Sequence, residues 1–380
     1  MRVLMQSRVT LFSVPGGDTI QILKTKEYLE RLGVRCDISL DLEPKLEGYD
    51  LVHLFNLMRP QEVYLQALNA KRQGKPVVLS PIYALYTEYE RNARPFPYRL
   101  LARLLTPSQI EYLKVLGRAV KNREHHKGTR AVLRYGYSRL LKKILEMADH
   151  LLPNSDSELK RISQDFDISG KPFTVVPNAA DPALFDPAKI KVSGKWDHLK
   201  NCVLCVARIE GRKNQLNLVR AVKDAPYKLA LVGEPAPNHR RYAEKVRRES
   251  SANVYFVGKV PHEELPELYY RAKVHVLPSW METTGLSSLE AGLMGCNLVI
   301  TDKGDTREYF GDYAYYCEPD SVESIRAAID RAWHDPVNPA LRQHILQNFT
   351  WEKAAEVTLE ACRKVLTEEV TIGARRQKQA

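Results

Sequence analysis

Two acidic and two basic residues in the second half of the chain have the types and spacing of a site for a phosphorylated ligand. Glu282 and Glu290 stand on either side of a polar turn, and Arg208 and Lys213 lie five residues apart after an apolar run. Two cations at this spacing can make charge-assisted hydrogen bonds with a diphosphate. Carboxylates on both sides of an amide-rich turn suit a ligand with phosphate in its middle and hydroxyls at its ends, which is the layout of a nucleotide sugar.

The turn between the two glutamates predicts a binding site for the phosphates themselves. The apolar run Val274–Leu277 predicts a strand, and a helix is expected to begin near Leu286. Backbone N–H groups around Thr284, Gly285 and Leu286 would then point at an anion, and the helix dipole would favour it. The alternative is that the two glutamates are ordinary surface charges, and the turn alone does not separate these interpretations.

The sequence from Glu282 to Glu290, with a glycine in the loop and Leu-Glu-Ala-Gly at its end, resembles the EX7E motif of GT4-type retaining glycosyltransferases, which have the GT-B fold. The resemblance implies that Glu282 contacts hydroxyls of the donor sugar and that Glu290 holds the ribose hydroxyls of the nucleotide. The segment Val206–Asn214 resembles a second segment of that family. This implies that Arg208 and Lys213 stabilise the leaving diphosphate, with no metal ion or other cofactor required. The alternative for these two cations is a pair of surface salt bridges.

Further matches to the family involve a glycine turn, a strand end and a pocket for the nucleotide base. The turn at Gly16 and Gly17 would line the donor diphosphate, with Asp18 facing the acceptor, although a tight turn needs no ligand. Gly233 would lie behind the donor site. The residues expected around the base are Lys259, Val260 and Leu265.

The chain departs from the family pattern at two places near the donor sugar. The loop after Glu282 reads Thr283-Thr284-Gly285 where the family usually has Gly-Phe-Gly, and the segment Leu79–Tyr83 lacks a histidine that many members have there. His53, in a neighbouring strand, is expected to be a packed core residue. We therefore hypothesise that the donor sugar is held differently because it lacks a hydroxyl at that place. The expected enzyme is a hexosyl- or deoxyhexosyltransferase.

The elements that must position these residues follow from an alternation of strand-like and helix-like segments. This pattern predicts βαβ units and two parallel, doubly wound sheets, with a ligand in the cleft between the two Rossmann-like halves. The predicted strands lie at 3–5, 34–40, 51–55, 76–80, 203–207, 229–232, 254–257, 274–277, 298–301 and 313–316. The predicted helices include 19–32, 67–72, 215–222 and 261–271.

The turn-rich stretch Pro177–Pro187 is suited to a linker and divides the chain into two predicted domains. Residues 1–186 would form an N-terminal acceptor domain, and residues 187–350 a C-terminal domain for the nucleotide sugar. Residues 351–370 would form a helix that packs back on the first domain. The small, polar and basic tail at 371–380 is expected to be disordered.

Composition supports a folded chain of two domains. Of the 380 residues, 44% are apolar and 27% are charged, which is a globular balance. No apolar run is long enough to span a membrane, and the N-terminal run is too short for a signal peptide, so a cytoplasmic location is expected. Cys202 and Cys205 form a CxxC without a second ligand pair, and buried strand residues are favoured over a metal site.

The net charge of +11 is concentrated in one region, Arg91–Lys143, which contains 14 Lys or Arg residues and 2 Asp or Glu residues. Such a region favours an anionic partner. Within it, leucines alternate with arginines over Tyr98–Leu105, as in segments that lie on an anionic membrane surface. An ordinary surface helix with a solvated basic face is an equal alternative.

The sequence therefore predicts a retaining glycosyltransferase that moves a sugar from a nucleotide-diphosphate sugar to a hydroxyl of a glycan or lipid-linked acceptor. The expected context is cell-surface polysaccharide or glycolipid biosynthesis, at the inner face of the cell membrane. One alternative is another GT-B nucleotide-sugar enzyme such as an epimerase, and a second is a non-catalytic basic binding protein. A nucleic-acid partner is not expected, because no recognised binding module is present.

Overall fold

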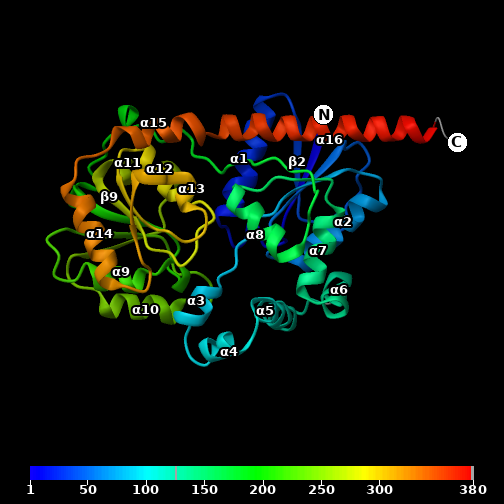
Figure 1. Cartoon of the computed structure of the whole chain (residues 1–380). Coiled ribbons are helices and arrows are strands. Elements are labelled where there is room, and N and C mark those ends of the chain that lie inside the picture. Colours follow the sequence, from blue (N-terminus) through cyan, green and yellow to red (C-terminus); the bar gives the residue numbers. More distant parts are fainter. Residues whose placement is uncertain (125, 378–380) are drawn as a thin grey trace. The chain divides into compact units, whose positions relative to one another are not determined.

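A computed structural model describes residues 1–124 and 126–377, excluding the side chains of residues 122 and 369–377, and divides the chain into two compact units (Figure 1). Unit 1 contains Met1–Tyr83, Leu104–Asn178 and the chain from Trp351 onward. Unit 2 contains Ala84–Arg103 and Ala179–Thr350. Each unit is built on its own parallel sheet.

Unit 1 has a five-stranded parallel sheet in the order β2-β1-β3-β4-β5. Its strands are β1 (Arg2–Gln6), β2 (Arg35–Ser39), β3 (Leu51–Phe55), β4 (Val77–Ser80) and β5 (His150–Leu151). Strands β3 and β4 are buried along their whole lengths, as expected where helices cover both faces of a parallel sheet. The order reverses between β1 and β3, so the loops after these two strands lie at the switch point of the sheet.

The helices of unit 1 begin with recognisable start signals. Thr106 and Gln109 form a reciprocal capping box at the start of α5, and Ser155 accepts a hydrogen bond from the Glu158 amide at the start of α8. The helices are α1 (Gly17–Arg31), α2 (Pro60–Arg72), α5 (Pro107–Asn122), α6 (Lys127–Tyr135), α7 (Tyr137–Met147), α8 (Asp156–Phe166) and α16 (Trp351–Gln377).

Helix α16 packs against α1 within unit 1. It continues past residue 370, where the sequence pattern predicted its end, to Gln377. The last three residues of the predicted tail, 378–380, lie outside the described residues.

Unit 2 has a six-stranded parallel sheet in the order β11-β10-β9-β6-β7-β8, and the strand order reverses between β6 and β9. Its strands are β6 (Cys202–Val206), β7 (Leu229–Val232), β8 (Val254–Gly258), β9 (Ala272–Leu277), β10 (Asn297–Thr301) and β11 (Ala314–Cys317). Its helices after residue 200 are α9 (Gln215–Ala221), α10 (Arg240–Glu249), α11 (Leu265–Arg271), α12 (Leu286–Leu293), α13 (Thr306–Phe310), α14 (Val322–His334) and α15 (Pro339–Asn348). Short 3₁₀ turns include η3 (Gly211–Lys213) and η4 (His262–Glu264).

A segment from the first half of the sequence, Ala84–Arg103, belongs to unit 2, although it lies between two stretches of unit 1 along the chain. It contains α3 (Thr87–Asn92) and most of α4 (Tyr98–Leu104). In Figure 1 both helices lie on the long connection between β4 and α5. The strand and helix pattern of the sequence does not predict that this segment joins unit 2.

The ten predicted strands are confirmed to within one or two residues at their ends. The short strand β5 was not predicted, because two residues carry too little pattern. The helix predicted at 261–271 begins only at Leu265, after the 3₁₀ turn η4, and Pro266 lies in its first turn. The helix predicted at 67–72 begins earlier, where Pro60 sets its first turn.

The six cysteines are free and buried. Cys202 and Cys205 lie in β6, where burial raises the pKa of each thiol to about 12, so their interpretation as buried strand residues is confirmed. Over residues 1–124 and 126–377, no group of His, Cys, Asp and Glu is arranged to hold a metal ion. In the same part of the chain, no helix combines the length and apolar character needed to cross a membrane.

Candidate functional site

The predicted cations and glutamates of unit 2 lie after two strands that are neighbours in the sheet. Arg208 and Lys213 follow β6, and Glu282 and Glu290 follow β9. Because the strands are parallel, their carboxyl ends meet at one edge, and β6 and β9 flank the point where the strand order reverses. Ligands of open α/β sheets bind at such a point. The fold therefore brings the two halves of the predicted site together.

Lys213 and Glu282 form an ion pair, with 2.5 Å between Lys213 Nζ and Glu282 Oε1. Both side chains are mostly buried. Burial alone would lower the pKa of Lys213, but the charge and hydrogen bond of Glu282 outweigh it and raise the pKa. The lysine is therefore held as a cation at a defined place, with its charge directed at the loop that carries Glu282.

Glu210 is a buried carboxylate between two arginines. Its Oε1 lies 3.1 Å from Arg212 Nη2 and 3.7 Å from Arg208 Nη2. Burial alone would raise the pKa of Glu210, but Arg212, Arg208 and Lys213 together lower it. Arg208 keeps 38% of its side chain exposed, against 29% for Arg212, and makes the longer contact, so it is the more accessible of the two arginines.

Side-chain amides fix the backbone of the loop that carries Arg208 and Lys213. Gln215 Nε2 donates to the Arg208 carbonyl oxygen over 2.9 Å, and the Glu210 amide donates to Gln215 Oε1 over 3.3 Å. Asn214, in the left-handed conformation at φ 61°, donates to the carbonyl oxygens of Pro278 and Pro319. The loop after β6 is thereby tied to the loop after β9.

The backbone of Glu282 is held by the loop after β10. The Glu282 amide donates to the Lys303 carbonyl oxygen over 3.2 Å, and the Asp305 amide donates to the Glu282 carbonyl oxygen over 3.0 Å. Between these bonds lies Gly304, at φ +86°, where a Cβ would lie 2.0 Å from the Glu282 carbonyl oxygen. Only glycine fits this position without moving Glu282.

Glu290, on α12, uses both carboxylate oxygens within unit 2. His262 Nε2 lies 2.7 Å from Oε1, and the Tyr269 hydroxyl donates to Oε2 over 2.9 Å. Neither His262 nor Tyr269 was identified from the sequence. His262 lies within the stretch that was expected to contact the base, where Leu265 is buried, and Tyr269 lies one helical turn after Leu265 on α11. In the same stretch Val260 is half-buried and Lys259 is exposed.

The predicted phosphate turn has the geometry of a helix start. Gly285 adopts φ +82° directly before α12, and the amide of Ser288 donates to its carbonyl oxygen over 2.8 Å. The amides of Leu286 and Ser287 come before this first helical hydrogen bond, and such groups can bind an anion. Thr284 is buried and Leu286 is half-buried.

Gly233 allows the ends of β6 and β7 to approach closely. At φ +138°, a Cβ on this residue would lie 2.2 Å from the Ala207 carbonyl oxygen. The Ile209 amide also donates to the Glu234 carbonyl oxygen over 2.9 Å. Gly233 therefore allows the close approach that positions the strand end carrying Arg208.

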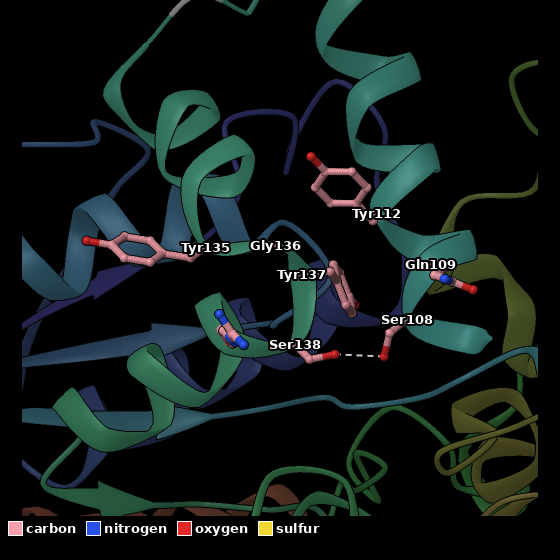
Figure 2. Close-up of a pocket in the computed structure, with 8 residues that line it drawn as sticks. Ser108, Gln109, Tyr112, Tyr135, Gly136, Tyr137 and Ser138 are labelled. Carbon is pink, nitrogen blue, oxygen red and sulfur yellow. Dashed lines mark hydrogen bonds between the residues drawn. The ribbon is translucent and has the colours of Figure 1, made fainter. Parts of the chain in front are cut away.

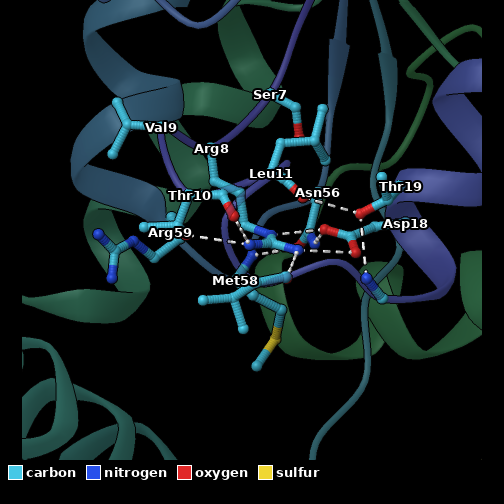
Figure 3. Close-up of polar contacts among 12 residues, drawn as sticks. Ser7, Arg8, Val9, Thr10, Leu11, Asp18, Thr19, Asn56, Met58 and Arg59 are labelled. Carbon is cyan, nitrogen blue, oxygen red and sulfur yellow. Dashed lines mark hydrogen bonds and ion pairs between the residues drawn. The ribbon is translucent and has the colours of Figure 1, made fainter. Parts of the chain in front are cut away.

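Gly16 and Gly17 lie in unit 1, at the start of α1 and after β1. Figure 3 shows the polar contacts beside them. The Asp18 carboxylate accepts hydrogen bonds from Arg8 Nε over 2.7 Å and from Asn56 Nδ2 over 2.8 Å. Asp18, which was expected to face the acceptor, therefore uses its carboxylate to join the loops after β1 and β3.

His53 lies in β3 and is buried. Its ring stacks on Phe55 with 4.0 Å between centroids, and its Nε2 lies 2.9 Å from Ser80 Oγ. Burial lowers the pKa of His53 to about 3, so the ring is neutral. The interpretation of His53 as a packed core residue is confirmed.

Unit 1 also contains a small cavity of about 270 Å³, where the first turns of α5 and α7 meet. Figure 2 shows its lining, in which the Ser138 hydroxyl donates to Ser108 Oγ over 2.7 Å. The lining residues are Ser108, Gln109, Tyr112, Tyr135, Gly136, Tyr137, Ser138 and Arg139. The cavity includes none of the predicted site residues, and it is small beside typical ligand pockets of about 300–1,000 Å³.

A family model matches the part of the chain that carries the candidate site in unit 2. Residues 186–350 match the family model described as glycosyl transferases group 1. O-antigen chain mannosyltransferase B of Escherichia coli is 29% identical over 170 residues, which cover 42% of this chain and 44% of the relative. MMP alpha-(1->4)-mannosyltransferase of Mycolicibacterium hassiacum is 25% identical over 241 residues, covering 61% of this chain and 58% of the relative. The chain thus spans about half the length of these curated relatives.

Solved structures match nearly the whole chain. Sucrose-phosphate synthase from Thermosynechococcus elongatus superposes with a TM-score of 0.71 at 18% identity, covering 97% of this chain and 100% of that one. HepE of Anabaena, solved in complex with UDP and glucose, superposes with a TM-score of 0.69 at 14% identity, covering 96% and 99%. These neighbours and the two parallel α/β domains confirm the predicted GT-B fold class.

Proposed function

We propose that the chain is a retaining glycosyltransferase that moves a sugar from a nucleotide-diphosphate sugar to a hydroxyl of a glycan or lipid-linked acceptor. The observation that carries this proposal is the group formed by Lys213, Glu282, Glu210 and Arg208 at the switch point of the unit 2 sheet. The matched family domain contains this group, and two similar relatives are named mannosyltransferases. The named complex of HepE with UDP and glucose supports a donor of the same chemical class.

In the proposed complex, the donor diphosphate lies between the first amides of α12 and the cations after β6. Arg208 and Lys213 then neutralise the charge that develops on the leaving diphosphate, which is the work a divalent ion does in other transferases. Glu282 holds hydroxyls of the donor sugar and Glu290 holds the ribose. The contact of Gly16 and Gly17 with the donor diphosphate remains a prediction.

The proposed reaction breaks the bond between the anomeric carbon and the diphosphate oxygen on the same face on which the acceptor oxygen attacks. The bonding electrons leave with the diphosphate, and the acceptor proton passes to a phosphate oxygen. The anomeric configuration is therefore kept. The protein contributes position and electrostatics, because paired and buried charges such as Lys213 and Glu282 need little reorganisation during the reaction.

The donor sugar is proposed to be a hexose or deoxyhexose that is held without a histidine after β4. His53 is packed against Phe55, so it does not supply the missing contact. A comparison of a 6-deoxy donor with its hydroxylated parent tests this part of the proposal. Equal or better use of the deoxy donor is expected, whereas a clear preference for the hydroxylated sugar contradicts it.

The donor is identified by thermal unfolding in the presence of a panel of nucleotide sugars that includes UDP-glucose and mannosyl donors. A true donor at 100 times its Kd stabilises the fold by about 2.7 kcal/mol. Glu290→Gln should weaken this effect, while Glu244→Gln, at an exposed position on α10, serves as the matched control. If no nucleotide sugar shifts the unfolding temperature, the proposal is wrong.

Product analysis then separates transfer from the alternative of epimerase-like chemistry. Incubation of the donor with a hydroxyl acceptor should yield a glycoside with the donor's anomeric configuration, measured by NMR. Turnover should persist in EDTA, because Arg208 and Lys213 supply the charge. Inversion at the anomeric carbon contradicts the retaining mechanism. Conversion of the donor sugar without an acceptor supports the epimerase-like alternative.

A further inference from the structure

The segment Arg91–Leu104 exposes apolar side chains that a globular fold normally buries. Phe96 is 73% exposed, Tyr98 is 56% exposed and Leu104 is 74% exposed. Leu100 and Leu101 are exposed between them. Five exposed apolar residues within nine positions of the chain indicate a binding surface, whereas single exposed apolar residues need no explanation.

The same segment contains four arginines and no acidic residue. Arg94 pairs with Glu90, and its guanidinium carbon lies 5.1 Å from the centroid of the Tyr98 ring. Arg99 and Arg103, both exposed, have no acidic partner in the part of the chain that the structure describes. The apolar residues are therefore interleaved with uncompensated positive charge.

Helix α4 buries one small residue against the rest of the chain. Ala102 is buried, and its carbonyl oxygen accepts a hydrogen bond from Arg91 Nε over 3.3 Å. The other six residues of the helix are exposed. The leucines and arginines on both sides of Ala102 are thus presented outward together.

We propose that Arg91–Leu104 is a docking surface for an anionic lipid bilayer. Leucines and aromatic rings enter the boundary between headgroups and acyl chains, and arginines beside them contact lipid phosphates. Each arginine near such a surface strengthens binding about fivefold. The surface deepens the proposed function by naming the phase in which the acceptor lies, but the docking itself does not depend on sugar transfer.

The combination of side chains selects a bilayer over other partners. A second copy of the chain would bring two sets of four arginines face to face. A nucleic acid would match the arginines but would leave Phe96 and the exposed leucines in water. An anionic bilayer satisfies both sets of side chains at once.

The start of the segment Ala84–Arg103 contacts the loops after β6 and β10, which support the proposed donor site of unit 2. The Arg212 guanidinium carbon lies 4.4 Å from the centroid of the Tyr86 ring, and Glu88 pairs with Lys303 over 3.0 Å. The backbone carbonyl oxygen of Lys303 accepts the hydrogen bond from the Glu282 amide. A bilayer that holds Arg91–Leu104 would therefore restrain residues that support the site, only a few positions earlier in the chain.

The test is sedimentation of the full chain with vesicles of phosphatidylcholine alone or mixed with phosphatidylglycerol, at low and high salt. We expect binding to the anionic vesicles, at least tenfold weaker at high salt. The double variant Leu100→Ser, Leu104→Ser should lose at least tenfold in binding, and Arg99→Gln, Arg103→Gln should lose a similar amount. The unfolding temperature of each variant without nucleotide reports whether it folds. The shift of that temperature on adding nucleotide reports whether the proposed donor site is intact.

The matched control is Val120→Ser, Leu133→Ser, which removes two exposed apolar residues of α5 and α6 within the same basic region. This control should bind vesicles as the parent chain does. The proposal is overturned by equal binding to neutral vesicles, by no binding to anionic vesicles at low salt, or by an equal loss in the control. Concentration-dependent dimer formation that the leucine variant abolishes, without vesicle binding, would also overturn it in favour of a second copy. Vesicle binding without sugar transfer would leave the docking surface standing and contradict only the proposed function.

Discussion

The donor-site loops of unit 2 and the surface Arg91–Leu104 use the same kinds of charged residue in opposite ways. In the loops, Lys213 pairs with Glu282, and Glu210 holds the two arginines beside it. On the surface, Arg99 and Arg103 face solvent beside exposed leucines. In the proposed function, the ion pairs of the loops form a fixed frame for the ligand. The surface is completed only by a partner that brings negative charge and an apolar phase.

This difference has an energetic cause. A mostly buried cation is costly unless a carboxylate and hydrogen bonds compensate for its desolvation, so the fold supplies Glu282 and Glu210 as built-in partners. An exposed arginine remains hydrated and needs no such partner. We therefore expect substitutions in the loops to change activity and stability strongly. Changes at the surface Arg91–Leu104 should have small effects that depend on the presence of a membrane.

The largest effect is expected for Lys213→Met. This change leaves the Glu282 carboxylate without its cation and, in the proposed reaction, removes a charge that stabilises the leaving diphosphate. We expect kcat/KM to fall about 10²–10³-fold and the free energy of unfolding to fall by about 3 kcal/mol. Steady-state kinetics and urea unfolding measure both. Lys200→Met, at an exposed position before β6, is the control, and equal effects in the two variants would contradict the role of Lys213.

The next effect concerns the frame behind Glu282. Gly304→Ala places a Cβ against the Glu282 carbonyl oxygen, and a shift of about 1 Å at a catalytic group can cost about 100-fold in rate. Gly295→Ala is matched in backbone conformation, at φ +83°, but its Cβ would meet no atom within 4 Å. Both variants should lose about 1–2 kcal/mol from the left-handed conformation. A loss of kcat/KM confined to the Gly304 variant would support the role of Gly304 in placing Glu282, and unchanged kinetics in that variant would contradict it.

A smaller effect is expected for Glu210→Gln, which leaves Arg208 and Arg212 less firmly oriented. We expect the KM for the donor to rise about tenfold, with a smaller change in kcat. Because the folded chain lowers the pKa of Glu210, its stabilising effect is complete above the unfolded pKa of about 4.3 and is lost as the pH falls through the lowered value. Urea unfolding should show the parent more stable than the variant at pH 7, with the difference shrinking below about pH 4. A difference that grows on acidification would be inconsistent with this pairing.

The smallest effect links the two regions. Anionic vesicles should tighten binding of the donor nucleotide about two- to fivefold, because they hold the segment that braces Arg212 and Lys303. Glu88→Gln should reduce this effect while leaving vesicle binding unchanged. Isothermal titration of the nucleotide with and without vesicles measures it. Identical affinities in both conditions would show that the docking surface and the donor site are independent.

Most of the sheet framework could be predicted from the sequence, because apolar runs and turn residues are local signals. Strands such as Leu51–Phe55 and Leu229–Val232 were placed without error. The resemblance led us to expect Arg208 and Lys213 near the glutamates after β9, and the adjacency of β6 and β9 gives this placement a physical basis. The role of Asp18 could not be predicted, because its partners Arg8 and Asn56 come from different loops.

The supporting residues of the site show the same limit. Gln215, His262, Tyr269 and Gly304 act through contacts with residues that are distant or oriented by the fold. A glutamine or a tyrosine in a helix has no local feature that reveals which loop it will hold. Such residues become visible only when the strands are placed side by side.

The sequence alone was enough to predict the alternation of strands and helices, to show the concentration of positive charge and to single out the four charged residues of the proposed donor site. These depend on residue type and short-range spacing. The tertiary structure decided that Glu282 meets Lys213, that Glu290 meets His262 and Tyr269, and that Ala84–Arg103 joins unit 2. It also decided that the leucines of α4 face outward instead of into a core. The reason is that the burial and the contacts of a side chain depend on the folded chain as a whole, so they cannot be predicted from the local sequence.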